Sequence, residues 1–181
     1  MHFINRVFGI IKIDNNIFKE IDKDGSAILQ AFLVALLTAT VNALIAKKYY
    51  FSTANFDIPI VILIIFWIFL NWYVLSYLIN IIGLNIFSNG KSKSKSKNLL
   101  RLIGYSYSPE LIKFLIIFYP KFIQVISLGT FIWVVACQVL AVKLTFNLKG
   151  LWKSLAIIVL SYILQILLVA FLLLAIFSFS T

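Results

Sequence analysis

Long apolar runs alternate with short polar segments along this chain of 181 residues. A helix needs about 20 residues to cross the roughly 30 Å hydrocarbon layer of a bilayer. Four runs reach that length unbroken, and a fifth reaches it with a break near its middle. The runs span residues 27–46, 59–87, 99–119, 122–143 and 152–179. The pattern therefore predicts an all-α fold, a polytopic integral membrane helical bundle with five transmembrane helices.

The run at 99–119 differs from the others because it holds a break and two charges. Ser108 and Pro109 fit the N-cap and first turn of a new helical segment. Glu110 would then lie where the helix dipole favours a carboxylate, with Lys113 in reach three residues later. Irregular backbone and ionisable groups at membrane depth need cover from other segments or a wet cavity. We therefore expect the other spans to pack around an intramembrane polar pair of Glu110 and Lys113.

Residues 1–24 show helical periodicity instead of one continuous apolar core. The apolar positions of the first helix are Phe3, Ile4, Val7, Phe8 and Ile11. Asp14 fits the N-cap of a second short helix. Charged residues interrupt the segment, which is therefore not a signal peptide. We interpret it as a cytoplasmic amphipathic N-terminal segment lying in the membrane interface, and the alternative is a docking arm for a partner.

The composition supports one membrane domain over residues 25–181. Hydrophobic residues make up 62% of the chain, against about 45–50% in soluble domains. The excess must face lipid, and the length leaves no room for a second domain. Small and polar residues recur on single faces of the spans, which predicts packing faces and interhelical polar seams. These sets are Ala31/Ala35/Thr38/Asn42, Ser154/Ser161/Gln165 and Tyr73/Tyr77/Asn80, for which a ligand site is the alternative. Trp133, Cys137 and Ala141 share one face of the span 122–143.

The net charge of +10 is distributed between the spans rather than along one surface. Five crossings place the N-terminal segment and the loops 88–101 and 143–153 on one side, with most of the Lys and Arg residues. Basic loops stay cytoplasmic, so the N-terminus should be cytoplasmic and the C-terminus outside. If 99–119 only dips into the membrane and returns, the bias weakens but survives. This distribution argues against a nucleic-acid partner.

Chemical motifs are scarce. His2 is the only histidine and Cys137 the only cysteine, so no zinc cluster is available. Apart from Asp57 and Glu110, every acidic residue lies in the first 24 positions. No carboxylate pair, phosphate loop or nucleophile elbow faces the bundle. We therefore predict no enzyme activity, no cofactor, and no catalytic, cofactor-binding or metal residues.

Three stretches of the chain resemble the Yip-one domain, the Ypt/Rab-interacting protein family. They are FKEIDKDGSAILQAFLVALLTATVNAL (18–44), LLRLIGYSYSPELI (99–112) and IWVVACQVLAVK (132–143), which precedes GLWKSLAI (150–157). The most specific part is an Arg-x-x-Gly-Tyr-x-x-x-Pro pattern at Arg101, Gly104, Tyr105 and Pro109. The resemblance implies five spans and a cytoplasmic N-terminus. The lack of a long N-terminal arm makes the chain similar to short bacterial and archaeal members.

The resemblance implies a non-enzymatic membrane scaffold or a partner-recruiting, trafficking-related protein. It would lie in the cell (inner) membrane of a prokaryote. Expected partners are the lipid bilayer, other membrane proteins or a second copy, and a small GTPase only if the eukaryotic role carries over. The alternative is a small transporter or channel component with Glu110 and Lys113 in a broken helix.

The pattern also carries structural expectations. Gly104 should lie where another helix passes close, since it has no side chain. The Tyr105 hydroxyl should meet a polar partner or the headgroup level. Pro109 should begin a new helical segment, because it lacks an N–H and clashes with a preceding turn.

Overall fold

A computed structural model describes residues 2–49, 58–87 and 96–179, and these residues form helices and short connections. The elements are α1 (Phe3–Ile11), α2 (Asn15–Lys23), α3 (Ala27–Tyr49), α4 (Ile58–Ile82), η1 (Gly83–Phe87), α5 (Ser96–Tyr105), η2 (Ser108–Ile117), η3 (Pro120–Phe122), α6 (Ile123–Phe146) and α7 (Leu151–Phe179). Of these, η1 is a π-helix, and η2 and η3 are 3₁₀ helices. The all-α membrane bundle is therefore confirmed in its class.

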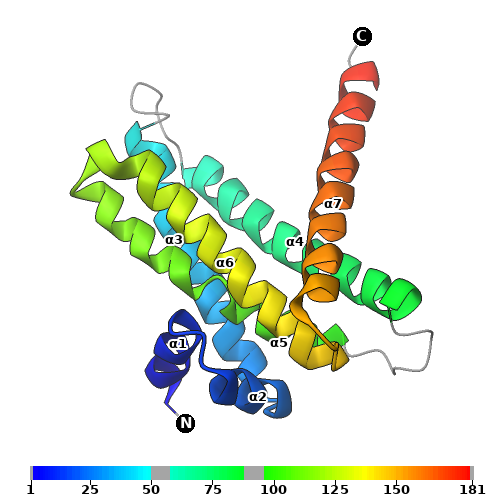
Figure 1. Ribbon diagram of the computed structural model, residues 1–181. Coiled ribbons are helices and arrows are strands. Elements are labelled where there is room, and N and C mark those ends of the chain that lie inside the picture. The colour runs from blue at the N-terminus through cyan, green and yellow to red at the C-terminus, as the bar shows by residue number, and fades with distance from the viewer. Residues whose placement is uncertain (1, 50–57, 88–95, 180–181) are drawn as a thin grey trace.

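The helices form an open bundle with a small helical arm at one end (Figure 1). The segments α3, η2 and α6 pack together, and α4 contacts α3, α5 and α7. The arm, α1 and α2, lies below these helices at the end where α3 begins. From its start beside the end of α6, α7 diverges from the bundle and carries the C-terminus to the far end (Figure 1).

Among the described residues, four helices are long and apolar enough to cross a membrane. They cover Ala27–Tyr49, Val61–Asn85, Pro120–Phe146 and Leu151–Leu172. The first three match the unbroken runs within three residues at each end, and the fourth starts one residue before its run and ends seven residues before the end of that run. The fifth run is divided between α5 and η2, and within the described residues it is no single helix of spanning length. The predicted break at Pro109 is the physical reason, because proline cannot continue an α-helix.

The broken segment runs parallel to α3 along almost its whole length. Gln30 Oε1 accepts a hydrogen bond from Tyr105 near the start of α3. Further along, Asn42 donates to Glu110, and the Tyr49 hydroxyl donates to the Ile116 carbonyl. Since η2 has ten residues and a 3₁₀ helix rises about 2.0 Å per residue, it extends roughly 20 Å.

The arm has a sharp, well-capped turn between its two helices. At the end of α1 the Asp14 N–H bonds to the Gly9 carbonyl, with Ile13 in the left-handed region at φ 57°. This is the Schellman pattern. The Asp14 side chain then accepts from the Asn16 N–H and caps α2, as predicted. Ile10 and Phe18 are fully buried, so the arm is packed onto the bundle.

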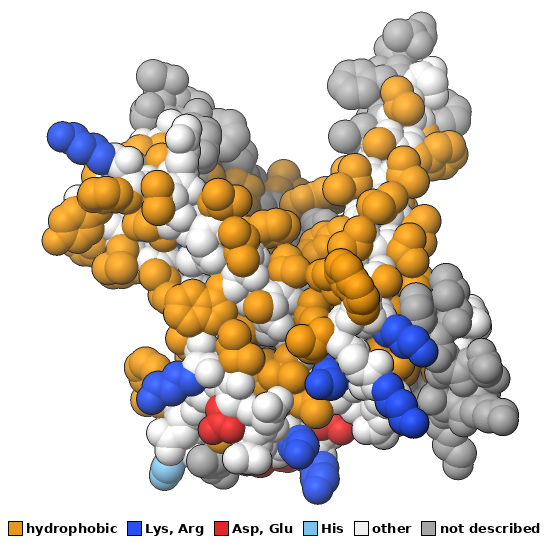
Figure 2. Space-filling view, viewed as in Figure 1, with side chains coloured by type: hydrophobic (Ala, Val, Ile, Leu, Met, Phe, Trp, Pro, Cys, Tyr) orange, Lys and Arg blue, Asp and Glu red, His pale blue; other side chains and the backbone are white. Residues whose placement is uncertain are grey.

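Apolar side chains cover the bundle surface, while charges gather at the arm end. Figure 2 shows the hydrophobic surface over α6, η2 and α7, with most Lys, Arg, Asp and Glu below it. Such extended exposed apolar surface is uncommon on soluble proteins and suits contact with lipid. The chain is therefore a membrane protein by the surface as well as by helix length.

The residues of the predicted polar seam are buried on α7, whereas two of those on α4 are exposed. Tyr73 and Tyr77 are 60% and 56% exposed, so the predicted interhelical seam is wrong for these two tyrosines. The cause is register, since Trp72 and Leu75 occupy the packed face of α4. On α7, Ser161 is buried, and Gln165 donates to Asn71 Oδ1 of α4 at 2.7 Å.

Candidate functional site

Gly104 lies at the tightest contact of α5 with its neighbours. A Cβ atom built there would be 2.9 Å from Trp72 Cζ2 and 3.0 Å from Ala31 Cβ. The first neighbour belongs to α4 and the second to α3. The Trp72 indole is held in place because its Nε1–H donates to the Leu100 carbonyl at 3.1 Å. Three helices therefore meet at a position where only glycine fits without displacement.

Tyr105, the next residue, connects α5 with the arm through a shared acceptor. Its hydroxyl donates to Gln30 Oε1 at 2.5 Å. The same oxygen accepts from Arg6 Nη1 at 2.9 Å. Arg6 also donates to Glu20 Oε1 at 2.8 Å and to Asp24 Oδ2 at 2.5 Å. With only 3% of its surface exposed, Arg6 joins α1, the end of α2 and the first turns of α3.

Opposite charges in this cluster stabilise each other. Hydrogen bonds from Ser26 and then Arg6 hold the pKa of the Asp24 carboxyl well below its ordinary value. Burial lowers the pKa of the Arg6 guanidinium, but hydrogen bonds to Asp24 and Glu20 outweigh burial and raise it overall. Breaking a buried, multiply bonded charge cluster leaves unpaired groups behind and is costly. We call Arg6, Glu20, Asp24, Gln30 and Tyr105 the arm junction.

Arg101 makes a second connection to the arm. Its Nη2 donates to the Asp22 carbonyl at 2.7 Å and to Asn98 Oδ1 at 3.0 Å. Asn98 in turn donates to Asp22 Oδ1 at 3.0 Å. The side chain is buried, and within the described residues its Nε has no acceptor. Arg101 therefore ties the end of α2 to the start of α5.

The other end of α1 is held by α6. The last carbonyl groups of a helix lack partners within the helix. Trp133 Nε1–H donates to the Ile11 carbonyl at 2.9 Å, and the Cys137 thiol lies 3.5 Å from the Ile10 carbonyl. These two residues belong to the face predicted on this span. They cap the arm from within the membrane bundle.

Pro109 lies in the first turn of η2, and the charged pair follows it directly. Lys113 Nζ lies 3.0 Å from Glu110 Oε1, and Asn42 Nδ2 donates to Glu110 Oε2 at 2.9 Å. Both carboxylate oxygens therefore have partners. The predicted capping role of Ser108 is wrong, because its hydroxyl donates back to the Tyr105 carbonyl at 2.7 Å. That hydrogen bond gives a partner to a carbonyl at the end of α5, and the start of η2 has no side-chain cap.

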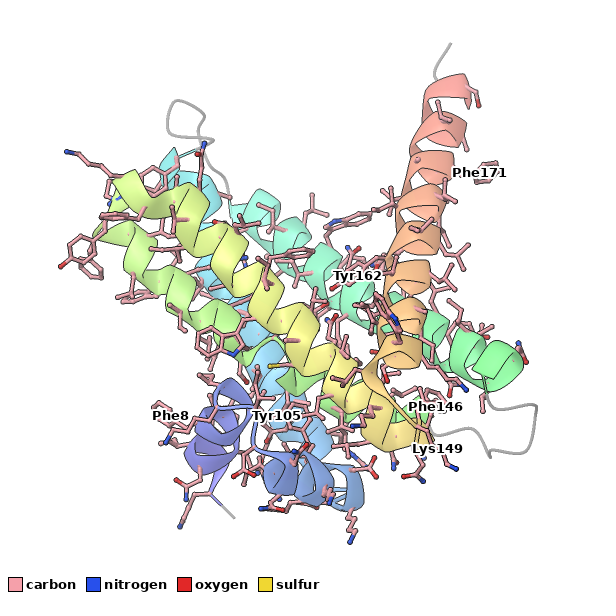
Figure 3. All side chains as sticks on the ribbon, viewed as in Figure 1. Phe8, Tyr105, Phe146, Lys149, Tyr162 and Phe171 are labelled. Atoms are coloured by element: carbon pink, nitrogen blue, oxygen red, sulfur yellow. The ribbon has the colours of Figure 1, made fainter. Side chains whose placement is uncertain are left out.

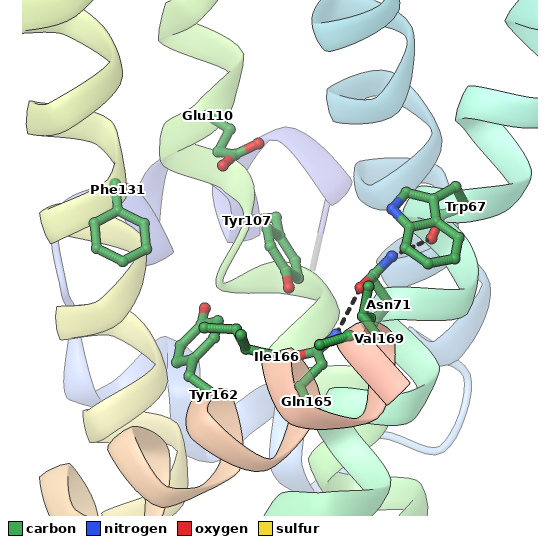
Figure 4. A pocket seen from close by; sticks show the side chains of 10 residues that line it. Trp67, Asn71, Tyr107, Glu110, Phe131, Tyr162, Gln165, Ile166 and Val169 are labelled. Atoms are coloured by element: carbon green, nitrogen blue, oxygen red, sulfur yellow. Dashed lines mark hydrogen bonds between the residues drawn. The ribbon is translucent and has the colours of Figure 1, made fainter. Parts of the chain in front are cut away.

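A cavity of about 570 Å³ opens beside Glu110, between α4, α6 and α7. Figure 4 shows its aromatic lining, with Tyr107 and Tyr162 pointing toward each other across the cavity. The Tyr162 hydroxyl donates to Gln138 Oε1 at 3.0 Å, so this polar group has a partner. Since the carboxylate of Glu110 is also paired, the cavity offers aromatic surface rather than a free charge.

The family comparison gives a decisive match. The Yip1 domain family model matches residues 8–174. The chain belongs to the Yip1 domain family. Comparison with curated proteins and comparison with solved structures give no match.

Within this Yip1 domain, the four pattern residues lie at successive levels of one segment. Arg101 contacts α2, Gly104 lies against α3 and α4, Tyr105 belongs to the arm junction, and Pro109 lies in the first turn of η2. The predicted pair, Glu110 and Lys113, forms one level further on. The structure thus brings all six predicted site residues onto α5 and η2, in contact with the arm at one end and with α3 along their length.

Sequence reasoning missed Arg6 and Gln30 as members of this site. Arg6 lies among the apolar positions of α1, where a charge needs partners. Glu20 lies in the next helix and Asp24 directly after it. That juxtaposition was the available signal. The arm as a whole carries four basic and four acidic residues over positions 1–24. Its charges can therefore pair among themselves, unlike those of the strongly basic remainder.

Proposed function

We propose that this Yip1 domain protein is a non-enzymatic membrane scaffold that presents its N-terminal arm to partners at the cytoplasmic membrane surface. The observation that carries the proposal is the arm junction. An arm held by a buried arginine, and capped by Trp133 and Cys137, keeps a fixed orientation relative to the bundle. A fixed surface binds a partner with less loss of conformational freedom than a flexible tail does.

The free face of α1 supplies the contact surface. Ile4 and Phe8 are 62% and 57% exposed, and Phe8 points away from the bundle (Figure 3). One α-helical turn separates them, so they form a single apolar strip. The opposite face, with Val7 and Ile10, is already buried. This strip suits the membrane interface or an apolar surface of another membrane protein or of a second copy. A small GTPase becomes a candidate partner only if the eukaryotic family role applies here.

We further propose five crossings, with the N-terminus cytoplasmic and the C-terminus outside, in the cell (inner) membrane of a prokaryote. The parallel course of the broken segment along α3 supports a fifth crossing, since it begins and ends at the same levels as that span. The excess of Lys and Arg in the N-terminal segment and in loops 88–101 and 143–153 supports the orientation.

Local pairing of the intramembrane charges favours this role over transport. Glu110 bonds to Lys113 and Asn42 in the same corner of the bundle, instead of facing a second charged group across a path. Within the described residues, no group of three or more His, Cys, Asp or Glu side chains converges. We therefore propose that the break at Pro109 serves packing.

Crosslinking in native membranes tests the recruiting role. The variant Ile4→Ser/Phe8→Ser changes only exposed side chains and should keep its membrane abundance. We expect it to lose the membrane-protein crosslinks, or self-crosslinks, that the wild type forms through the arm. Lys19→Ser, an exposed change on α2, should keep them and serves as the matched control. Wild-type protein without any reproducible crosslink, or a double variant with an unchanged set, would refute the proposal.

A further inference from the structure

A second concavity lies on the bundle surface between the arm turn, α6 and the start of α7. It has a volume of about 740 Å³, and its walls are almost entirely apolar. Val135 and Val139 of α6 form one wall, and Leu151 and Leu155 of α7 form the other. Ile132 closes the far end and Lys143 the near end. We call this concavity the arm groove.

The length of the arm groove corresponds to one membrane leaflet. Ile132 and Lys143 are eleven residues apart on one helix, which at 1.5 Å per residue is about 16 Å. Half of the roughly 30 Å hydrocarbon layer is about 15 Å. The near end lies at the end of α6, and Figure 3 places Lys149 at that same end of the bundle. The length of the groove therefore suits an acyl chain of one leaflet.

The near end has the chemistry of a membrane surface and carries a cation. Trp152 is 79% exposed there, as tryptophans at headgroup level commonly are. Lys143 lines the groove, and its ammonium group forms no ion pair or hydrogen bond with the described residues. Asn15 is the other polar residue of the lining, and no acidic side chain contributes. The rim is thus positive above apolar walls.

Ile13, in the lining of the groove, adopts a backbone conformation that β-branched residues avoid. Its φ of 57° lies in the left-handed region, where glycine or asparagine is the usual residue. A strained conformation that persists is a reason to look for a function. Here the strain places an apolar side chain, 38% exposed, against the groove.

We propose that the arm groove binds an anionic phospholipid. One acyl chain would lie between α6 and α7, and the phosphate would meet Lys143, while Ile13 and Asn15 of the arm turn complete the lining. Basic pockets at the surface end of membrane helices are a recognised setting for acidic headgroups. The combination of leaflet length, apolar walls and an unpaired cation distinguishes this groove from the aromatic cavity beside Glu110. The proposal does not depend on the recruiting role.

Native mass spectrometry of the full chain tests the charge requirement. The protein would be extracted from nanodiscs of phosphatidylcholine containing an equal amount of phosphatidylglycerol, and the retained lipid counted. We expect preferential retention of one phosphatidylglycerol. Lys143→Gln should reduce that preference about fivefold, the loss of one near-surface charge contact. Lys121→Gln, which removes an exposed cation from η3, should leave it unchanged.

Two further variants test the walls and the arm turn. Ala136→Phe places a ring into the groove from α6 and should abolish retention of both lipids. Ile13→Asn introduces a residue that tolerates positive φ. It should leave the melting temperature in lipid-free detergent unchanged or raise it by up to roughly 2–4 °C. It should nevertheless weaken phosphatidylglycerol retention, because the apolar contact is gone. Those opposite signs would separate a lipid site from a purely structural turn.

The proposal is overturned if wild-type protein retains both lipids equally, or if Lys121→Gln reduces the preference as much as Lys143→Gln does. It is also overturned if Ile13→Asn lowers the melting temperature and leaves phosphatidylglycerol retention unchanged. That last result would assign Ile13 to packing of the arm. Wild-type protein that keeps its lipid preference but forms no reproducible arm crosslink would count against the recruiting role alone.

Discussion

Replacing Gly104 with leucine tests directly how α5 packs. Carbon atoms at optimal contact are about 3.5–4.0 Å apart, whereas a Cβ here would lie 2.9 Å from Trp72 Cζ2 and 3.0 Å from Ala31 Cβ. Trp72 cannot swing aside without breaking its hydrogen bond to the Leu100 carbonyl. The Ala31 methyl moves only with the backbone of α3. Even one added carbon therefore pushes α3, α4 and α5 apart.

The magnitude follows from the number of atoms added. Overpacking a well-packed core costs about 1–3 kcal/mol. Gly104→Ala gains about 1 kcal/mol of helix propensity, so it should be close to neutral or lose about 2 kcal/mol. Gly104→Leu adds three more carbons to the same space, and we expect a loss of about 3 kcal/mol. For a chain of this size that is a fall in melting temperature of roughly 6–12 °C.

Thermal unfolding of purified variants in one detergent measures the effect. The matched control is Gly129→Leu, because a Cβ on that residue of α6 meets nothing within 4 Å. Its free energy of unfolding should stay within about 0.5 kcal/mol of wild type. In a Trp72→Ala background the cost of Gly104→Ala should shrink, since the clashing ring is absent. An unchanged midpoint for Gly104→Leu would refute the packing argument.

A reporter active only in the cytoplasm, fused after Thr181, should stay inactive, because the five crossings that we propose would place the C-terminus outside; strong activity would mean an even number of crossings. As pH falls below about 4, the stability of the wild-type protein should fall toward that of Asp24→Asn, which lacks the contribution of this carboxylate at every pH. The folded-state pKa of Asp24 is lowered, so its contribution is complete above the unfolded value of about 3.9 and disappears below it; melting curves that stay parallel with pH would contradict this. Trp133→Phe should cost about 0.5–1.5 kcal/mol by removing the bond to the Ile11 carbonyl, and should speed proteolysis within the arm; an unchanged cleavage rate would show that α6 does not hold α1.

The sequence predicted the features that depend on neighbouring residues alone. Apolar runs become helices because their residues have no other way to satisfy the backbone in lipid. Asp14 caps α2 because the capping bond spans two residues. The break at Pro109 follows from the ring of proline itself. Each of these rules operates within one helical turn. The presence of the helices, and the division of the arm into α1 and α2, could therefore be predicted closely.

The arm junction could not be predicted in the same way, because its bonds join distant positions. Arg6 meets Glu20, Asp24 and Gln30 across 14, 18 and 24 residues. No periodicity within one helix specifies which of several acids an arginine will reach. The choice depends on how the α1–α2 turn aims the two helices, and that turn relies on Ile13 in a conformation unusual for isoleucine.

The change from α-helix to 3₁₀ helix at Pro109 explains how one segment meets two different demands. Arg101 and Tyr105 are four residues apart, so in α5 they share a face with Gly104 and meet the arm and α3 together. Glu110 and Lys113 are three residues apart, the spacing that eclipses side chains when a turn holds three residues. Between lipid-embedded helices, close packing and polar contacts replace the hydrophobic effect as the force for association. The α-helical part supplies the close packing at Gly104 and the attachment of the arm. The 3₁₀ part directs a charge pair that neutralises itself toward Asn42 of α3. A continuous α-helix is excluded here because Pro109 has no N–H to donate to the Tyr105 carbonyl, which accepts a hydrogen bond from the Ser108 hydroxyl instead.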